Sequence, residues 1–343
     1  MNRQIIVKIK EQILQNGSIV IVTHTSPDGD AIGSSLGFFH FLQTFIPKRN
    51  VRVIVPSEFP SFLKWMPAVD EIIVFPANEE AAIKCINNAD LCFCLDFNSL
   101  KRTDKLSPYL EASNAFKILI DHHPQPDNNF DLMISNVASS STCELIYDVI
   151  HAMSGVEALN KEIASCLYVG IMTDTGSFSY SCRRPETYLV VAELIRQGIN
   201  SELIHRKIYD TYSESRMRLL GFCLSERLKI LNGFHTAYIY LTENDLKNFN
   251  YQNGDTEGVV NYALSIEGIV LAVLFTEKEG KIRLSLRSKG EFSVNDLARK
   301  YFNGGGHKNA SGGDSFKSMN DTLTFFESIL NDYQNDLIKS VDN

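Results

Sequence analysis

Short, uninterrupted runs of apolar residues alternate with helical patterns through the first half of the chain. Runs of this kind are typical of strands that helices cover on both faces, because neither face alternates with solvent. We expect strands at residues 19–23, 51–55, 71–75, 91–96 and 116–121, and helices at residues 3–15, 31–45 and 79–88. The order of these elements predicts an α/β domain built on a doubly wound, mainly parallel sheet.

The pattern changes in the second half of the chain. Helical periodicity runs from Ser141 to about Leu228 with one interruption at Thr173–Ser177, and turns that contain glycine follow it. In this later part we expect strands at residues 235–241, 269–276 and 281–288. The change favours a second, smaller α+β domain. We therefore expect an α/β domain at residues 1–200, a helical linker at 201–230 and an α+β domain at 231–343.

A polar turn follows the first expected strand and carries His24, Asp28 and Asp30. Ligands of open α/β sheets bind outside the carboxyl ends of the strands, so three such side chains favour a divalent-metal turn. The same stretch also fits a plain helix start in which Asp28 or Asp30 is the N-cap. A calcium loop of the helix–loop–helix type is disfavoured, because Phe39 occupies the position of its bidentate glutamate.

Three further polar groups stand where apolar segments end, namely Asp96, Asp121-His122-His123 and Asp174. The two adjacent histidines cannot both point into a core, and Pro124 ends the strand at that point. Each group alone also fits a capping or hydrogen-bonded structural role. With the first turn included, two of these histidines and four of these aspartates would form a hard donor set, which suits Mn²⁺ or Mg²⁺ better than a structural zinc with thiolate ligands.

Composition narrows the class of protein. The 343 residues suit two domains, and a hydrophobic content of 44% is enough for two cores. The net charge of −8 argues against a protein that coats long nucleic acid with cations, and leaves a small anionic ligand open. The seven cysteines are scattered, without the spacing of a metal or redox pair. No apolar run approaches a membrane span and no secretory segment is recognised, so we expect a cytoplasmic protein without membrane contact.

The C-terminal part contains three glycines, residues 304–306, directly before His307. Three glycines are often a plain linker, but the Ala-Ser-Gly-Gly that follows favours a tight loop whose N–H groups approach a phosphate. Residues 281–308 hold seven Lys or Arg against two acidic residues, a basic patch that the global charge conceals. Within it Arg287, followed by Ser288, is our candidate for binding a terminal phosphate, because a guanidinium matches phosphate oxygens. Other cations of the patch fit a solvated strand face.

These motifs resemble the DHH phosphoesterase superfamily. The stretches His24–Ala31, Asp96, Asp121–His123 and Thr173–Gly176 are similar to its four motifs and occur in the same order. The stretch Gly304–Gly313 resembles the signature of its associated C-terminal substrate-binding domain. The resemblance spans nearly the whole chain. With this length and with no appended sensor domains recognised, the chain is similar to the NrnA-like oligoribonucleases.

The resemblance implies a site for two Mn²⁺ ions, with Mg²⁺ as the alternative. It assigns His24 and Asp28 to one ion, Asp30, His122 and Asp174 to the other, and Asp96 to both. A hydroxide between the ions would be the nucleophile, because metal coordination lowers the pKa of water. His123 is assigned to the phosphate or leaving oxygen, and Asp121 either orients the histidines or is merely structural.

Substrate contacts are expected from both domains. Arg102, six residues after Asp96, is the candidate for the scissile phosphate, although Phe97 stands where many relatives carry a small polar residue. In the C-terminal domain the expected contacts are Arg287, Ser288, Gly304, Gly305, Gly306 and His307.

The resemblance implies an enzyme of RNA degradation that hydrolyses short oligoribonucleotides to mononucleotides and dephosphorylates pAp (adenosine 3′,5′-bisphosphate) to AMP. Hydrolysis of cyclic or linear dinucleotide messengers, such as c-di-AMP or pApA, is the alternative, because the catalytic motifs permit it equally. A non-catalytic nucleotide sensor is disfavoured by the complete set of six candidate metal ligands. We expect short RNA and pAp as binding partners and no long nucleic acid, and the sequence leaves a homodimer open.

Overall fold

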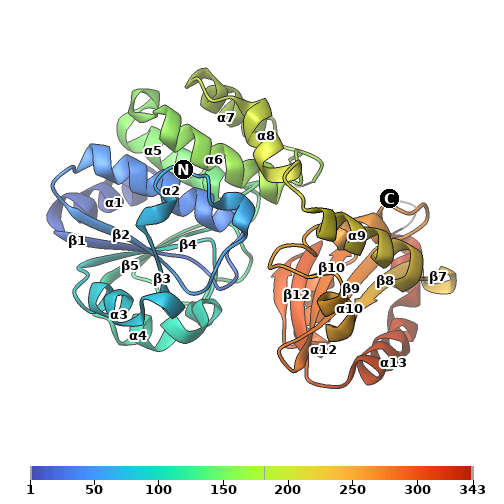
Figure 1. Ribbon diagram of the computed structural model, residues 1–343. Coiled ribbons are helices and arrows are strands. Elements are labelled where there is room, and N and C mark those ends of the chain that lie inside the picture. The colour runs from blue at the N-terminus through green and yellow to red at the C-terminus, as the bar shows by residue number, and fades with distance from the viewer. Residues whose placement is uncertain (1, 181, 341–343) are drawn as a thin grey trace. The chain divides into compact units, whose positions relative to one another are not determined.

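The structure is a computed structural model that describes residues 2–180 and 182–340. The chain forms two compact units, Met1–Thr211 and Tyr212–Asn343, coloured by residue number in Figure 1. The division lies inside residues 201–230, where we expected a helical linker. Residues 1 and 341–343, at the outer ends of the two expected domains, lie outside the described residues.

The N-terminal unit is built on a six-stranded sheet in the order β3-β2-β1-β4-β5-β6. Its strands are β1 (Ser18–Val22), β2 (Asn50–Val55), β3 (Ile72–Val74), β4 (Leu91–Leu95), β5 (Phe116–Asp121) and β6 (Leu132–Ser135). Each neighbouring pair runs parallel. The expected strands of this sheet are therefore present, and β6 is an addition that the apolar pattern did not indicate.

Helices cover both faces of this sheet, as Figure 1 shows. One face carries α1 (Arg3–Gln15), α2 (Gly29–Phe45), α5 (Thr142–Ser154) and α6 (Lys161–Asp174), and the other carries α3 (Glu79–Asn87) and α4 (Ser107–Ala112). Along β1, Ile19 and Ile21 join the core beneath the first group, and Val20 and Val22 join the core beneath the second. The prediction of a doubly wound, mainly parallel sheet is confirmed, and its uninterrupted apolar strands follow from burial on both faces.

Glycines let α2 and α6 pack closely together. A Cβ on Gly29 would collide with the side chain of Thr173, and a Cβ on Gly33 would lie 2.6 Å from the Cys166 carbonyl oxygen. Gly29 is the first residue of α2, and its missing side chain permits this close approach. The contact brings the start of α2 next to the end of α6, where Asp174 stands.

The helical stretch after residue 141 is more divided than we predicted. Besides α5 and α6 it contains α7 (Pro185–Arg196), α8 (Ser201–Tyr209) and α9 (Glu214–Phe222). One break follows Ser154 at Gly155, whose φ of +76° suits glycine at the end of a helix. Another lies at the expected interruption after Thr173.

The C-terminal unit is an α+β domain on a mixed sheet in the order β11-β12-β10-β9-β8-β7, which confirms the expected class. The strands are β7 (Leu228–Leu231), β8 (Thr236–Leu241), β9 (Leu271–Lys278), β10 (Lys281–Ser288), β11 (Gly305–His307) and β12 (Ala310–Ser315). Only β8 and β9 run parallel among the described pairs. Its helices are α9, α10 (Glu243–Asn248), α11 (Val259–Leu264), α12 (Val294–Tyr301), α13 (Met319–Ile329) and α14 (Gln334–Lys339).

The glycine-rich stretch, for which we expected a tight loop, is part of the sheet. It forms β11 and β12, an antiparallel hairpin in which Gly305 pairs with Gly312 and His307 with Ala310. Glycines weaken a strand on average, but here their missing side chains allow neighbouring backbones to approach closely.

Among the described residues no helix combines the length and apolarity that a membrane crossing requires.

Candidate metal and phosphoester site

The strand order of the N-terminal sheet fixes where a ligand site is expected. The order in which strands are added to the sheet reverses between β1 and β4, since β2 and β3 lie to one side and β5 and β6 to the other. Open α/β sheets bind ligands at this switch point, outside the carboxyl ends of the strands. His24 follows β1 and Asp96 follows β4, so both stand at the switch point.

His24, Asp28 and Asp96 form a first group of side chains. The Nε2 atom of His24 lies 3.4 Å from Asp96 Oδ2 and 4.0 Å from Asp28 Oδ1. His24 Nδ1 lies 2.8 Å from the Thr25 carbonyl oxygen, which can only accept a hydrogen bond, so Nδ1 carries the proton and donates it. The lone pair of Nε2 therefore points at the two carboxylates, as in a metal-binding histidine.

Asp30, His122 and Asp174 form a second group. His122 Nε2 lies 3.6 Å from Asp30 Oδ2 and 3.4 Å from Asp174 Oδ2. His122 Nδ1 donates to the Ser139 carbonyl oxygen at 3.3 Å, which again leaves Nε2 to face the carboxylates. Two separate stretches of chain thus present histidines of the same tautomer to carboxylate clusters.

Asp96 lies between the two groups. Its Oδ2 atom faces His24, and its Oδ1 atom lies 3.6 Å from His122 Nε2. The residue directly follows β4 with φ +66°, a left-handed conformation that is unfavourable for a side chain other than glycine and is often found at functional sites. The structure therefore brings together all six residues that we expected as metal ligands.

Asp28 satisfies both interpretations that the sequence left open. Its Oδ1 atom accepts hydrogen bonds from the backbone amides of Asp30 and Ala31, each at 3.0 Å, so Asp28 is the N-cap of α2. The same carboxylate belongs to the first group through its approach to His24. Capping fixes the carboxylate at the start of the helix and does not remove it from the cluster.

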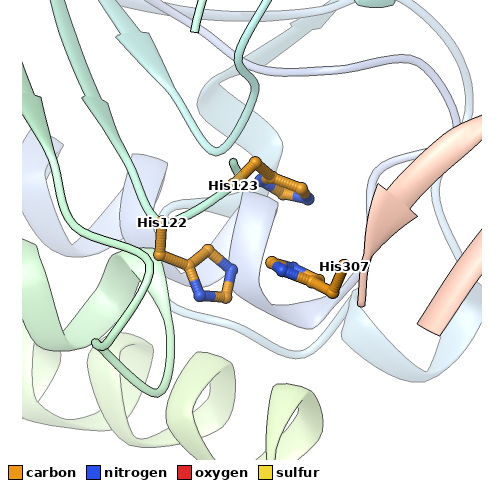
Figure 2. A group of neighbouring side chains, drawn as sticks. All are labelled: His122, His123 and His307. Atoms are coloured by element: carbon orange, nitrogen blue, oxygen red, sulfur yellow. The ribbon is translucent and has the colours of Figure 1, made fainter. Parts of the chain in front are cut away.

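Asp121 and His123 form a buried pair beside the two groups. His123 Nδ1 donates to Asp121 Oδ1 at 2.7 Å, and the Asp121 side chain is fully buried. Figure 2 shows the rings of His122 and His123 after the end of β5, with their centroids 5.0 Å apart. Asp121 therefore sets the orientation of His123, and the third side chain in Figure 2, His307, belongs to the C-terminal unit.

Burial and crowding set the charges of the cluster. Burial, reinforced by the neighbouring Asp96, raises the pKa of Asp30 well above its ordinary value. Burial, reinforced by Asp28, does the same to the pKa of Asp96. So many carboxylates in one buried volume are costly unless cations balance them.

Two imidazoles of the cluster, those of His24 and His123, are held neutral. Burial lowers the pKa of His24, and lowers the pKa of His123 well below the ordinary value, with the positive charge of Arg102 acting in the same direction on both. Burial would raise the pKa of Asp28, but the His24 ring and the Ala31 amide outweigh it and hold this pKa below its ordinary value. Neutral imidazole and ionised carboxylate are the forms that bind metals.

The donor set fits divalent cations. Ligand atoms that share one ion at about 2.1 Å lie roughly 3 to 3.5 Å from each other, close to the separations of 3.4 and 3.6 Å found here. Both histidines present Nε2 and donate from Nδ1 to a carbonyl, the usual arrangement of a metal ligand. Carboxylates dominate the set, which favours Mn²⁺ or Mg²⁺.

Arg102 lies next to this cluster. It belongs to the 3₁₀ segment Leu100–Leu106, is half-buried, and its carbonyl oxygen accepts a hydrogen bond from the Thr25 amide at 2.8 Å. Among the described residues its guanidinium forms no ion pair with a carboxylate. A cation that acts on His24, His123 and Asp28 without forming an ion pair is suited to a phosphate of the substrate.

The expected C-terminal residues are divided between the two faces of the sheet. Arg287 pairs with Ala310, and Ala310 pairs with His307, so these three side chains form one row on the same face. Ser288 lies on the opposite face, where its hydroxyl donates to the Phe292 carbonyl at 2.6 Å. The structure therefore brings Arg287 and His307 to one face and gives Ser288 a place in the interior.

Two of the three glycine amides are used within the unit. The amide of Gly304 donates to the Ala298 carbonyl at 3.2 Å, and that of Gly306 donates to Asn295 Oδ1 at 2.9 Å. The sequence suggested that these amides bind a phosphate, but in the structure they already donate to groups of the protein. Two of the basic side chains are also paired, Lys281 with Asp314 and Lys308 with Glu291.

Gly304 and Gly305 are expected to respond differently to alanine. A Cβ on Gly304 would collide with the backbone of Gly312, whereas a Cβ on Gly305 would meet Asn295 Oδ1 at an ordinary 3.5 Å. We expect Gly304→Ala to lower the free energy of unfolding of the C-terminal unit by about 2–3 kcal/mol, and Gly305→Ala to change it by less than about 1 kcal/mol. Urea unfolding followed by circular dichroism measures both, and equal midpoints would contradict the observed hairpin.

One segment near the cluster is missed by motif reasoning. Residues 139–144 contain Ser139, which accepts from His122, and Thr142, whose amide and hydroxyl contact two of the carboxylates. The run Ser-Ser-Ser-Thr before a helix is the signal in the sequence, but such runs ordinarily indicate only an N-cap.

The fold and the cluster define an α/β protein with a buried site for hard cations at the switch point of its sheet. Comparison with known families makes the class specific. Residues 18–171 match the DHH family, N-terminal domain, and residues 233–332 match the DHHA1 domain. The chain belongs to the DHH family, and the assignment made from the motifs is confirmed.

Curated relatives have names that agree with this family. The "Probable bifunctional oligoribonuclease and PAP phosphatase NrnA" of Streptococcus mutans is 31% identical over 87% of this chain and 90% of the relative. The Bacillus subtilis protein "Bifunctional oligoribonuclease and PAP phosphatase NrnA" is 31% identical over 86% of this chain and 88% of its own length. These names agree with the expectation of a DHH-family phosphoesterase.

A solved structure is similar over almost the whole chain. The crystal structure of an exopolyphosphatase-related protein from Bacteroides fragilis has a TM-score of 0.92 and 44% identity, and the match covers 98% of both chains. Each unit taken by itself therefore has a fold that is also found in a solved structure.

Proposed function

We propose that the protein hydrolyses short oligoribonucleotides to mononucleotides and removes a phosphate from pAp, with two Mn²⁺ ions as cofactors. The observation that carries the proposal is the position of Asp96, whose two oxygens face two separate histidine-carboxylate groups. The names of the curated relatives support the substrates. Such substrates arise where RNA is degraded, and the proposal includes a cytoplasmic location.

The two groups would hold one ion each. His24 and Asp28 are our ligands for the first ion, Asp30, His122 and Asp174 for the second, and Asp96 for both. Bound divalent ions lower the pKa of water and neutralise charge on phosphoryl oxygens, which are the main needs of phosphoester hydrolysis. The buried, carboxylate-rich cluster suits this role because it is electrostatically incomplete without cations.

His123 and Arg102 are our candidates for contacts with the reacting phosphate. Since Asp121 binds Nδ1 of His123, Nε2 is the nitrogen that faces the phosphate or leaving oxygen and can exchange a proton with it. Arg102 brings a positive charge to the same cluster. Asp121 acts through His123 and does not itself contact the substrate.

Arg287 and His307 are our candidates for a more distant part of the substrate. The small Ala310 separates them in the row, and the neighbouring row contains Gly305 and Gly312. A face with a guanidinium, an imidazole and bare backbone suits a phosphate and the nucleoside next to it.

A substrate panel tests the proposal. The full chain with Mn²⁺ is expected to release mononucleotides from a labelled RNA dinucleotide and phosphate from pAp, faster than it hydrolyses c-di-AMP. The linear dinucleotide pApA, inorganic pyrophosphate and polyphosphate are the further comparison substrates. The proposal fails if neither the RNA dinucleotide nor pAp is hydrolysed, and preferred turnover of c-di-AMP would favour a role in messenger hydrolysis.

Arg287→Ala is expected to weaken substrate binding more than it slows chemistry. A charge-assisted hydrogen bond contributes about 1.5–3 kcal/mol, so KM for pAp should rise roughly 10- to 100-fold with kcat largely unchanged. Lys281→Ala is the matched control, because Lys281 is on the same strand but is paired with Asp314. Steady-state kinetics on both variants gives the comparison, and similar KM values for the two would refute the assignment of Arg287.

A further inference from the structure

The first turn of α5 holds one of the proposed ligands in place. The amide of Thr142 donates to Asp30 Oδ2 at 2.7 Å, and the amide of Cys143 donates to Asp30 Oδ1 at 2.9 Å. Asp30 comes from α2, so its carboxylate binds the N-terminus of a different helix, where amides lack partners and the helix dipole favours a negative charge. Both oxygens of Asp30 are fixed by this contact.

The side chain of the same residue contacts a second proposed ligand. Thr142 Oγ1 donates to Asp96 Oδ1 at 2.9 Å, and Thr142 is fully buried. Thr142 therefore binds Asp30 through its amide and Asp96 through its hydroxyl. These two carboxylates come from helix α2 and the end of strand β4, and Thr142 joins them.

The helix itself does not need the hydroxyl of Thr142. The N-cap of α5 is Ser141, whose Oγ atom accepts from the Glu144 amide at 3.1 Å. Valine would serve equally well as the first residue of this helix, since it has the same shape and a backbone amide. The hydroxyl is thus explained by Asp96 and not by capping.

The segment that carries Thr142 is itself fixed by hydrogen bonds to the Glu144 side chain. The buried Glu144 accepts from the Ser140 amide at 3.1 Å and from Thr187 Oγ1, in α7, at 2.8 Å. On the same segment, the Ser139 carbonyl oxygen accepts from His122 Nδ1. One short stretch of chain therefore orients three of the proposed ligands, His122, Asp30 and Asp96.

We propose that Thr142 is a positioning residue that fixes Asp30 and Asp96 relative to each other and so sets the affinity of the proposed second metal site. The inference rests on the metal ligands named under the proposed function. Asp30 belongs to the second group and Asp96 to both, whereas Thr142 does not contact His24 or Asp28 in the described hydrogen bonds. Loss of its hydroxyl should therefore weaken one metal site more than the other.

Calorimetric titration of the full chain with MnCl₂ tests this inference. The wild type is expected to bind two Mn²⁺ ions. Thr142→Val is expected to bind the first ion normally and the second ion about 10- to 100-fold less tightly, which is the usual range for a residue that supports metal ligands. Thr142→Ser keeps the hydroxyl and should restore binding close to that of the wild type. Thr142→Ala is a second variant without the hydroxyl and without added methyl groups against Asp96.

Thr322→Val is the matched control. Thr322 is also fully buried, and its hydroxyl pairs with Ser315 Oγ at 2.8 Å in the C-terminal unit. The substitution removes a hydroxyl of the same kind without contact to the cluster, so Mn²⁺ binding should be unchanged.

The outcomes separate the inference from the proposed function. If the wild type binds no Mn²⁺, the proposed two-metal function fails. If the wild type binds two ions and Thr142→Val and Thr142→Ala bind both as tightly, the positioning role is refuted and the function stands. Equal weakening by Thr142→Ser and Thr142→Val would also refute it, because serine retains the hydroxyl.

Discussion

Asp96→Asn is expected to lower the rate of phosphodiester hydrolysis by about 10³-fold or more, beyond the roughly 10- to 100-fold typical of residues that only support metal ligands. The amide has the shape of the carboxylate, but it carries no charge and replaces one oxygen by an NH₂ group that cannot bind a cation. Since each oxygen of Asp96 faces a different histidine, the substitution disturbs one group whichever way the amide turns. Release of mononucleotide from a labelled RNA dinucleotide measures the effect.

Asp70→Asn is the control for this variant, because Asp70 is exposed and lies outside the cluster. It should hydrolyse the dinucleotide at the wild-type rate. Undiminished activity of Asp96→Asn would refute the bridging role. A wild type that binds nucleotides but never hydrolyses them would instead support the sensor alternative.

Manganese is expected to raise the stability of the N-terminal unit strongly. A ligand that binds only the folded state at about 100 times its Kd adds about 2.7 kcal/mol to the free energy of unfolding for each site. Two occupied sites would therefore add roughly twice this amount. Thermal unfolding of protein treated with EDTA, with and without added MnCl₂, measures the gain.

This gain should depend on pH in a defined direction. The pKa values of Asp30 and Asp96 are raised above the ordinary 3.8, so their contribution to the stability of metal-free protein is present below that pH and is lost as the pH rises through the raised values. The lowered pKa of His24 acts oppositely, but only below its ordinary 6.5. Both carboxylates must lose their protons to bind Mn²⁺, so the stability gained from Mn²⁺ should be larger at about pH 8 than at about pH 5. A gain that falls over this interval would contradict the prediction.

The elements of the N-terminal sheet were predictable because each strand is buried on both faces. Residues such as Ile19 to Val22 form an apolar run that no helix start or turn interrupts, and the run becomes β1. Strand β6 was missed because only one of its four residues, Ile134, is buried. Strands β11 and β12 were missed because Gly305 and Gly312 have low strand propensity, and only the pairing of their backbones with neighbours makes them strands.

The candidate site was predictable as a set of residues and not as an arrangement. Polar side chains directly after apolar strands indicate ligands at the carboxyl ends of the strands, and this rule identified His24, Asp96 and His122. Asp174, at the end of an apolar helical segment, lies 150 positions after His24 in sequence and is brought close by the packing of α2 on α6. Their role as metal ligands stays a prediction until Mn²⁺ binding is measured.

The amino-acid sequence by itself determined the class of fold, the family and the identity of the candidate ligands, because these depend on local patterns and on motifs read in order. Only the tertiary structure decided which oxygen faces which imidazole, that Ser288 lies in the interior, and that Thr142 joins Asp30 to Asp96. The physical reason is that hydrogen bonds between distant segments depend on how helices and strands pack. Local sequence patterns carry little information about that packing.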